Sequence, residues 1–210
     1  AQPAPALLEL LFWVLANVLG EALWLATPRG RGYVSMGTAT NFATLLLLPT
    51  PVAILVSAGA GAFADVAFRH RRWYKVLFNA AVCSVSVSAT ARVIRGFAGG
   101  PADLNLLLSP LHVSTLGLGA LTLFLTNTWL VSGAIALERV ENPWRVWRTC
   151  FASNFGLLAG GVLSLLGLFF AALFIAWGYM SAFAAVATAY VVRDGYRRYV
   201  DTVERTQAAS

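Results

Sequence analysis

The sequence predicts an all-α fold, a polytopic transmembrane bundle of about seven helices. Hydrophobic residues make up 59% of the chain and charged residues only 11%, whereas about a quarter of the residues in soluble domains are charged. The apolar residues occur in long stretches separated by short basic clusters. A lipid bilayer offers the backbone no hydrogen-bond partners, so spanning segments form helices or closed barrels. Stretches such as 157–174 lack the alternating polarity of barrel strands, which favours helices.

Seven hydrophobic segments define the expected helices. Pro49 and Pro51 predict a tight hairpin between the second and third segments, and Trp177-Gly178-Tyr179 predicts a similarly short turn between the last two. The second segment is short, so we expect it to tilt or re-enter, which makes the number of spans six or seven. The segments are 5–26, 34–49, 51–68, 74–97, 111–137, 153–176 and 178–194.

The basic residues predict the orientation of these helices. When the seven segments are threaded through a membrane, 13 of the 15 Lys and Arg residues fall in loops and helix ends on one side. Only Arg92 and Arg95 fall on the other side. By the positive-inside rule, the N-terminus is outside and the C-terminus is cytoplasmic. We therefore expect a bundle over 1–195 and a short charged tail over 196–210, in a bacterial inner membrane. The lipid bilayer accounts for the positive charge, so nucleic acid is not an expected partner.

Polar residues at membrane depth are the candidate ligand-binding residues, because burying them in lipid is costly. Glu9, Trp13, Asn17 and Glu21 recur every four residues and so share one helical face. Structural roles are the alternative: Asn17 would bond a neighbouring helix, and Arg92 would reach the outer surface. The candidates are Asn17, Glu21, Asn41, Asn79, Arg92 and Asn127.

Two further positions have more specific expectations. Asp65 precedes Arg69 by four residues, which predicts an ion pair within the third helix at its inner end. His112 opens the fifth segment and is a candidate axial ligand, with a plain interfacial role as the alternative. Nothing else in the sequence indicates a metal, and the cofactor stays unknown.

The segment around Pro143 predicts a short helix lying at the membrane surface. Pro143 suits a first helical turn, Trp144 and Trp147 fall on one side, and Arg145 and Arg148 are placed to reach lipid headgroups. These four residues are the expected contact surface for a partner or for the membrane.

Several short motifs together resemble the N-terminal multi-helix membrane sensor region of bacterial HD-GYP and GGDEF signalling proteins. They are Gly20-Glu21-Ala22, the Pro49-x-Pro51 hairpin, 62–65, 73–81, 142–148 and 196–200. The resemblance implies a membrane input module of cyclic-di-GMP signalling. The chain has no HD, GYP or GGDEF segment, so the catalysis of that family would belong to another part or protein.

No catalytic motif stands out in the sequence, and we do not expect an enzyme. The first functional hypothesis is a non-catalytic sensory or small-molecule-binding membrane module that acts through a protein partner. An accessory subunit of a larger bioenergetic complex, in contact with lipids or pigments, is the alternative. A substrate-binding component of a small-solute importer is a third possibility. The sequence leaves the ligand, the partner and the oligomeric state open.

Overall fold

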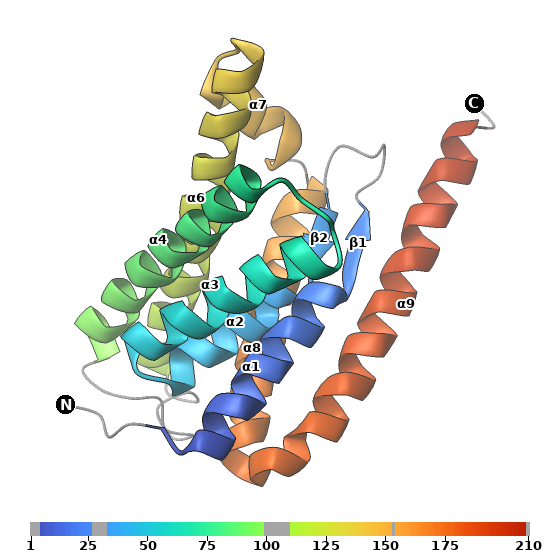
Figure 1. Cartoon of the computed structure of the whole chain (residues 1–210). Coiled ribbons are helices and arrows are strands. Elements are labelled where there is room, and N and C mark those ends of the chain that lie inside the picture. Colours follow the sequence, from blue (N-terminus) through green and yellow to red (C-terminus); the bar gives the residue numbers. More distant parts are fainter. Residues whose placement is uncertain (1–4, 27–32, 99–109, 153, 209–210) are drawn as a thin grey trace.

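The computed structural model describes residues 5–26, 33–98, 110–152 and 154–208, which form a helical bundle with one short β-ribbon (Figure 1). Each of the seven hydrophobic segments forms a helix, which confirms the predicted helical fold. Four stretches of the described chain are long and apolar enough to cross a membrane, namely 50–67, 73–97, 113–139 and 157–195. The protein therefore has the helix lengths and composition of a membrane protein.

The first helix ends earlier than the sequence predicts. Helix α1 covers Leu7–Ala22, and the chain then forms strand β1 (Trp24–Ala26), which pairs antiparallel with β2 (Tyr33–Ser35). The expectation of helix up to residue 26 is wrong. Pro28 follows closely and cannot continue a helix. The ribbon instead turns the chain back toward the end of α1.

Helix α2 (Gly37–Leu47) is short and lies in the middle of the bundle, against α1, α3 and α8. Its 11 residues extend about 17 Å, roughly half of a bilayer core. Most of its side chains are buried, and Phe42 is 1% exposed. A Cβ at Gly167 of α8 would lie 2.5 Å from the carbonyl oxygen of Ala39, so glycine permits the close crossing of these two helices.

Helices α1, α3, α4 and α6 form a row beside α2. Helix α3 (Thr50–Ala67) lies between α1 and α4 (Trp73–Ala98), and α4 lies between α3 and α6 (Pro110–Arg139). Helix α8 (Asn154–Trp177) covers the other side of α2. Only Leu48 and Pro49 separate α2 from α3, which confirms the predicted tight hairpin. The core of the bundle is therefore centred on α2.

Helix α9 (Ser181–Ala208) runs along one side of the bundle, packed mainly against α8 and the short 3-10 helix η2 (Gly178–Met180) (Figure 1). Gly178 has a φ of +58°, a left-handed conformation that suits glycine, and it makes the predicted turn after α8. The helix continues without a break through residues 195 and 196, where the sequence predicts the end of the bundle. Helix α9 thus runs from the bundle into the charged tail without interruption.

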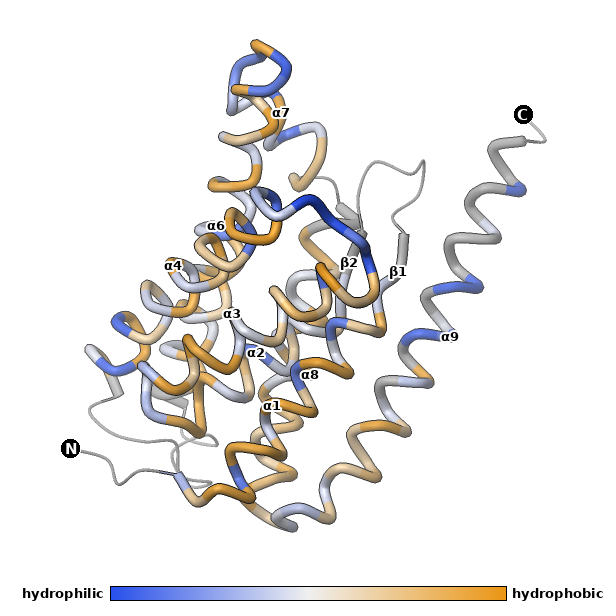
Figure 2. Tube along the Cα trace, viewed as in Figure 1, coloured by the Kyte–Doolittle hydropathy of each residue, from blue (hydrophilic) through white to orange (hydrophobic). Residues whose placement is uncertain are grey.

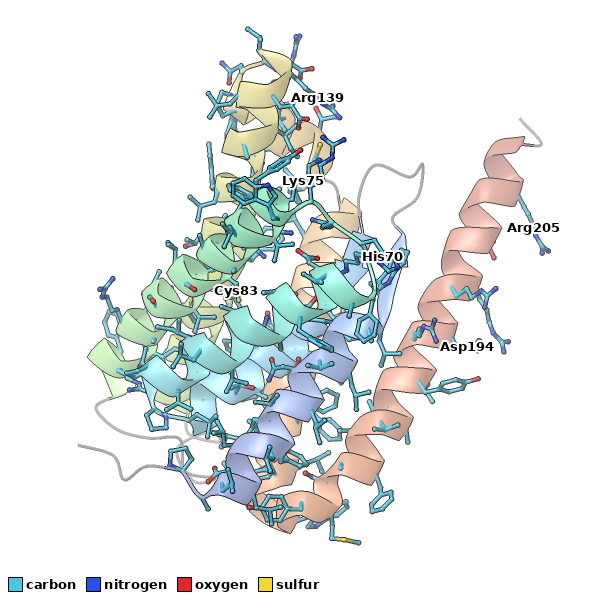
Figure 3. The ribbon with its side chains drawn as sticks, in the orientation of Figure 1. His70, Lys75, Cys83, Arg139, Asp194 and Arg205 are labelled. Atoms are coloured by element: carbon cyan, nitrogen blue, oxygen red, sulfur yellow. The ribbon has the colours of Figure 1, made fainter. Side chains whose placement is uncertain are left out.

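Hydrophilic residues gather at one end of the molecule, where α3 meets α4 and where α6 meets α7 (Pro143–Cys150) (Figure 2). His70, Lys75, Arg139 and Arg205 all lie toward this end (Figure 3). We call it the basic end. The folded chain thus places at one end several groups of basic residues that are far apart in the sequence.

Candidate functional site

A buried ion network lies at the basic end, with Arg69 at its centre. One terminal nitrogen of Arg69 lies 2.8 Å from Oε2 of Glu21, and the other lies 2.8 Å from Oδ1 of Asp65. Arg69 also donates a hydrogen bond of 2.9 Å to the carbonyl oxygen of Glu21. The Asp65 side chain is 1% exposed and that of Arg69 10% exposed. The guanidinium therefore links α1 to α3 in a site largely shielded from solvent.

Three more residues complete this network. Asn79 of α4 donates a 2.5 Å hydrogen bond to Oδ2 of Asp65, and Nε of Arg71 lies 3.5 Å from Oδ1. Ser35, at the end of β2, donates a 3.0 Å hydrogen bond to Oε2 of Glu21. We call Glu21, Ser35, Asp65, Arg69, Arg71 and Asn79 the charge cluster. It joins α1, the β-ribbon, α3 and α4 at one point.

Small residues allow the charge cluster to form. A Cβ at Gly37 would collide with the Glu21 carboxylate, and a Cβ at Gly20 would lie 2.7 Å from Oγ1 of Thr40. Glycine at both positions lets α1 and α2 approach closely, which seats Glu21 against the start of α2. The amide of Gly37 donates a 2.8 Å hydrogen bond to Oγ of Ser35, which holds that hydroxyl beside Glu21.

The charges of this cluster balance, with two carboxylates facing two guanidinium groups. Both oxygens of Asp65 accept hydrogen bonds or ion-pair contacts from its neighbours. A buried ion pair is maintained only when its members are also hydrogen-bonded, and removal of one partner is strongly destabilising. The arrangement can therefore hold four elements in a fixed relation at the basic end.

A second polar contact lies deeper in the bundle, between α1 and α2. Asn17 is fully buried and donates hydrogen bonds of 2.7 Å to Oγ1 of Thr44 and to the carbonyl oxygen of Trp13. Its Oδ1, Nε1 of Trp13 and Oδ1 of Asn41 are buried without a partner among the described residues. The predicted alternative for Asn17, a bond to a neighbouring helix, is confirmed.

The other candidate ligand residues lie apart from these two contacts. Arg92 is exposed on α4, about 20 Å along the helix from Asn79. Asn127 is exposed on α6. His112 lies in the first turn of α6, and its side chain is outside the described part of the chain. The fold thus brings Glu21 and Asn79 into one cluster and leaves Arg92 and Asn127 on separate surfaces.

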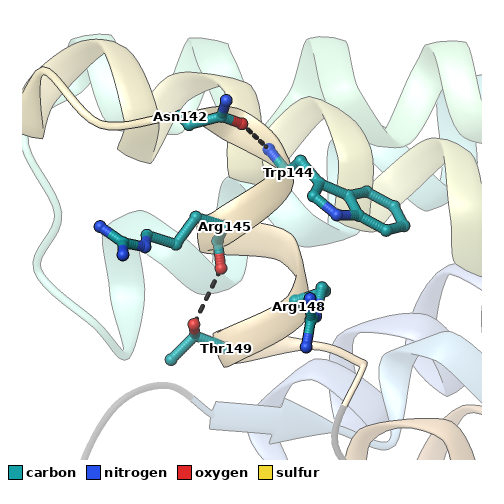
Figure 4. Close-up of a pocket in the computed structure, with 5 residues that line it drawn as sticks. All are labelled: Asn142, Trp144, Arg145, Arg148 and Thr149. Carbon is teal, nitrogen blue, oxygen red and sulfur yellow. Dashed lines mark hydrogen bonds between the residues drawn. The ribbon is translucent and has the colours of Figure 1, made fainter.

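Helix α7 presents a surface of its own, as the sequence predicts for residues 143–150. Asn142 caps the helix by accepting a 2.8 Å hydrogen bond from the amide of Trp144 (Figure 4). Three indoles pack with near-parallel rings: the ring centroids of Trp129, Trp144 and Trp147 lie 5.3–5.9 Å from one another, and we call these three residues the indole stack. Beside them is an open hollow of about 570 Å³, which is lined by Asn142, Trp144, Arg145, Arg148 and Thr149.

Sequence reasoning found part of this arrangement. The Asp65–Arg69 ion pair is confirmed, because it depends only on helical spacing. The contact between Glu21 and Arg69, 48 residues apart, was not predicted. The available signal was a lone acidic residue at the end of one apolar segment and a basic cluster at the corresponding end of another. That signal indicates a shared membrane face without specifying which side chains meet.

Comparisons with protein-family models, with curated proteins and with solved structures find no match for this chain. Within the described residues, no group of three or more His, Cys, Asp or Glu side chains is placed to hold a metal ion. The described residues thus combine four apolar helical stretches of membrane-spanning length, a buried ion network and an exposed amphipathic helix.

Proposed function

We propose that the protein is a non-catalytic integral membrane module that acts through a protein partner, with α9 as the contact. The observation that supports this proposal is the exposure of α9. Phe183, Val186, Tyr190 and Val191 are each at least 59% exposed, although the helix packs on α8 nearby. The same helix continues into the charged segment that begins at Arg193. A partner on this side would contact both an apolar and a charged stretch.

A sensory role fits the relation between α9 and the rest of the bundle. The charge cluster fixes α1, α3 and α4 to one another at the basic end, whereas α9 contacts mainly α8 and η2. A change in α8 or η2 would therefore shift α9 without breaking the charge cluster. The resemblance of the sequence to the sensor region of HD-GYP and GGDEF proteins supports the same proposal.

The proposed topology has an outer N-terminus and a cytoplasmic basic end in a bacterial inner membrane, with seven hydrophobic helices of which α2 spans only partly. Its support is the gathering of hydrophilic residues at one end (Figure 2). Single cysteines at Arg148, Arg205 and Arg92, in a Cys83→Ala/Cys150→Ala background, test this topology in intact cells. An impermeant thiol reagent is expected to label only position 92. Labelling of 148 or 205 would refute the orientation.

Photo-crosslinking tests the partner. A photoreactive residue replaces Phe183 or Tyr190 on α9, and a matched control replaces Leu55, which is 74% exposed on α3. The two α9 positions are expected to give a protein adduct of defined mass in native membranes, and Leu55 is expected to give lipid adducts. Lipid adducts at all three positions would refute α9 as the contact.

A structural subunit of a larger bioenergetic complex is the second candidate, and the exposure of Asn127 favours it. This amide lies on the surface of α6 within a long apolar stretch, where lipid tails cannot hydrogen-bond it. A neighbouring helix of another subunit would supply a hydrogen-bond partner for it. In that case Asn127→Leu would release the chain from a large assembly in gentle detergent extracts. The control is Leu121→Ala, at an exposed position on a different side of α6, which would not release it.

A further inference from the structure

We infer that the exposed face of α7 is a binding site for the phosphate group of an anionic phospholipid, held by Arg145 and Arg148. The two side chains extend from successive turns of the helix and line the hollow described above (Figure 4). This site is separate from the charge cluster and from α9.

The site is built on a rigid support. Val146 is 3% exposed, so the inner face of α7 is packed against the protein. Nε1 of Trp147 donates a 3.0 Å hydrogen bond to Oγ1 of Thr128, which ties α7 to α6. The stack of Trp129, Trp147 and Trp144 adds a second tie between the same two helices. The arginines on the outer face therefore start from fixed backbone positions.

Both arginines are available for a ligand. Within the described residues, neither Arg145 nor Arg148 forms an ion pair, although the carboxylates of Glu138 and Glu141 are close in sequence. All four of these side chains are exposed. Arg69, by contrast, has both of its terminal nitrogens engaged by carboxylates. Two guanidinium groups that line one hollow, and that form no ion pair among the described residues, match the charge of a phosphate.

The position of α7 favours a lipid as the source of that phosphate. The helix follows α6, whose last turns expose Leu137 at 85%, and the next residue after α6, Val140, is 94% exposed. Large apolar side chains this exposed next to basic ones are typical of the boundary between lipid tails and headgroups. Trp144, 51% exposed, adds an indole of the kind that is enriched at this depth. Basic pockets on the cytoplasmic side commonly bind anionic headgroups.

Native mass spectrometry of the full chain tests the site. The protein is reconstituted in phosphatidylcholine nanodiscs containing increasing fractions of phosphatidylglycerol, and bound phosphatidylglycerol is counted after gentle release. The test variant is Arg145→Gln/Arg148→Gln. The control is Arg72→Gln/Arg205→Gln, which removes the same charge from exposed positions. Arg205 lies toward the basic end (Figure 3), and Arg72 directly precedes α4 there. We expect the test variant to lose about 30-fold in apparent affinity, since each basic residue at an anionic surface contributes roughly fivefold.

Four outcomes would overturn the assignment. Unchanged lipid retention in the test variant excludes the two arginines, and equal loss in the control shows a general effect of surface charge. Displacement of the lipid by millimolar inorganic phosphate would show that the site takes a soluble anion. The unfolding midpoint of the test variant is expected to equal that of the unaltered protein. A large shift would show that the arginines are structural instead.

Discussion

Arg69 and Arg145 lie toward the same end of the molecule, and their surroundings are opposite. Arg69 is 10% exposed and holds two carboxylates from two helices. Arg145 is exposed on α7 and, within the described residues, pairs with no carboxylate. The difference indicates that the basic end contains two kinds of arginine, one that fixes the fold and one that remains open to a ligand. Sequence position alone does not separate them.

Removal of Asp65 is expected to have the largest effect on the charge cluster. Asp65→Ala leaves Arg69 and Asn79 without their shared partner in a buried site, and we expect a loss of about 3–5 kcal/mol in the free energy of unfolding. Denaturant titration in detergent measures it. The control is Asp194→Ala, which breaks the exposed Asp194–Arg198 pair on α9 and should cost less than about 1 kcal/mol. Similar losses in both would contradict a stabilising role for the cluster.

Arg69→Lys tests whether the guanidinium is needed or only its charge. An ammonium group cannot reach Glu21 and Asp65 with the two-pronged geometry of arginine, so one charged hydrogen bond is lost. We expect destabilisation of about 1.5–3 kcal/mol by the same titration. The matched control is Arg72→Lys, an exposed neighbour, which should leave the midpoint unchanged. A tolerated Arg69→Lys would mean that charge alone holds α1 to α3.

Trp147→Phe tests the support beneath the open arginines. The ring remains in the stack, and the 3.0 Å hydrogen bond to Thr128 is lost, so we expect a cost of about 1 kcal/mol. Trp144→Phe is the control, because Trp144 belongs to the same indole stack and is 51% exposed. If both variants unfold alike, the hydrogen bond does not anchor α7.

The smallest effect is expected for Arg145→Gln. An exposed side chain that forms no ion pair among the described residues should change the free energy of unfolding by no more than about 0.5 kcal/mol. Together with a clear loss in Arg69→Lys, this result would show that only Arg69 stabilises the fold. A loss comparable to that of Arg69→Lys would mean that Arg145 is also structural.

Much of the fold follows from local sequence. Long apolar stretches predicted the helices, Pro49 and Gly178 predicted the two tight turns, and the spacing of Asp65 and Arg69 predicted their ion pair. These features depend on residues close together in the chain. The strand at Trp24 was missed because a three-residue ribbon inside an apolar segment has no periodicity of its own.

The candidate site was less predictable. Glu21 and Asn79 were singled out as costly polar residues at membrane depth, but nothing local showed that both would meet around Asp65 and Arg69. Arg92 and Asn127 met the same criterion and lie on exposed surfaces. Polarity within an apolar segment therefore identified which residues need partners, and it did not identify the partners.

The apolar composition and the lack of alternating polarity in the long stretches were enough to predict a helical class of structure, because helices satisfy their backbone polar groups within each segment. The sequence also determined the uneven distribution of charge along those helices. The central position of α2, and the ion network shared by α1, α3 and α4, became visible only in the folded chain. The tertiary structure also left α7 and α9 with exposed faces. The reason is physical: helix formation is satisfied within each segment, whereas partner choice depends on which small residues let two helices approach.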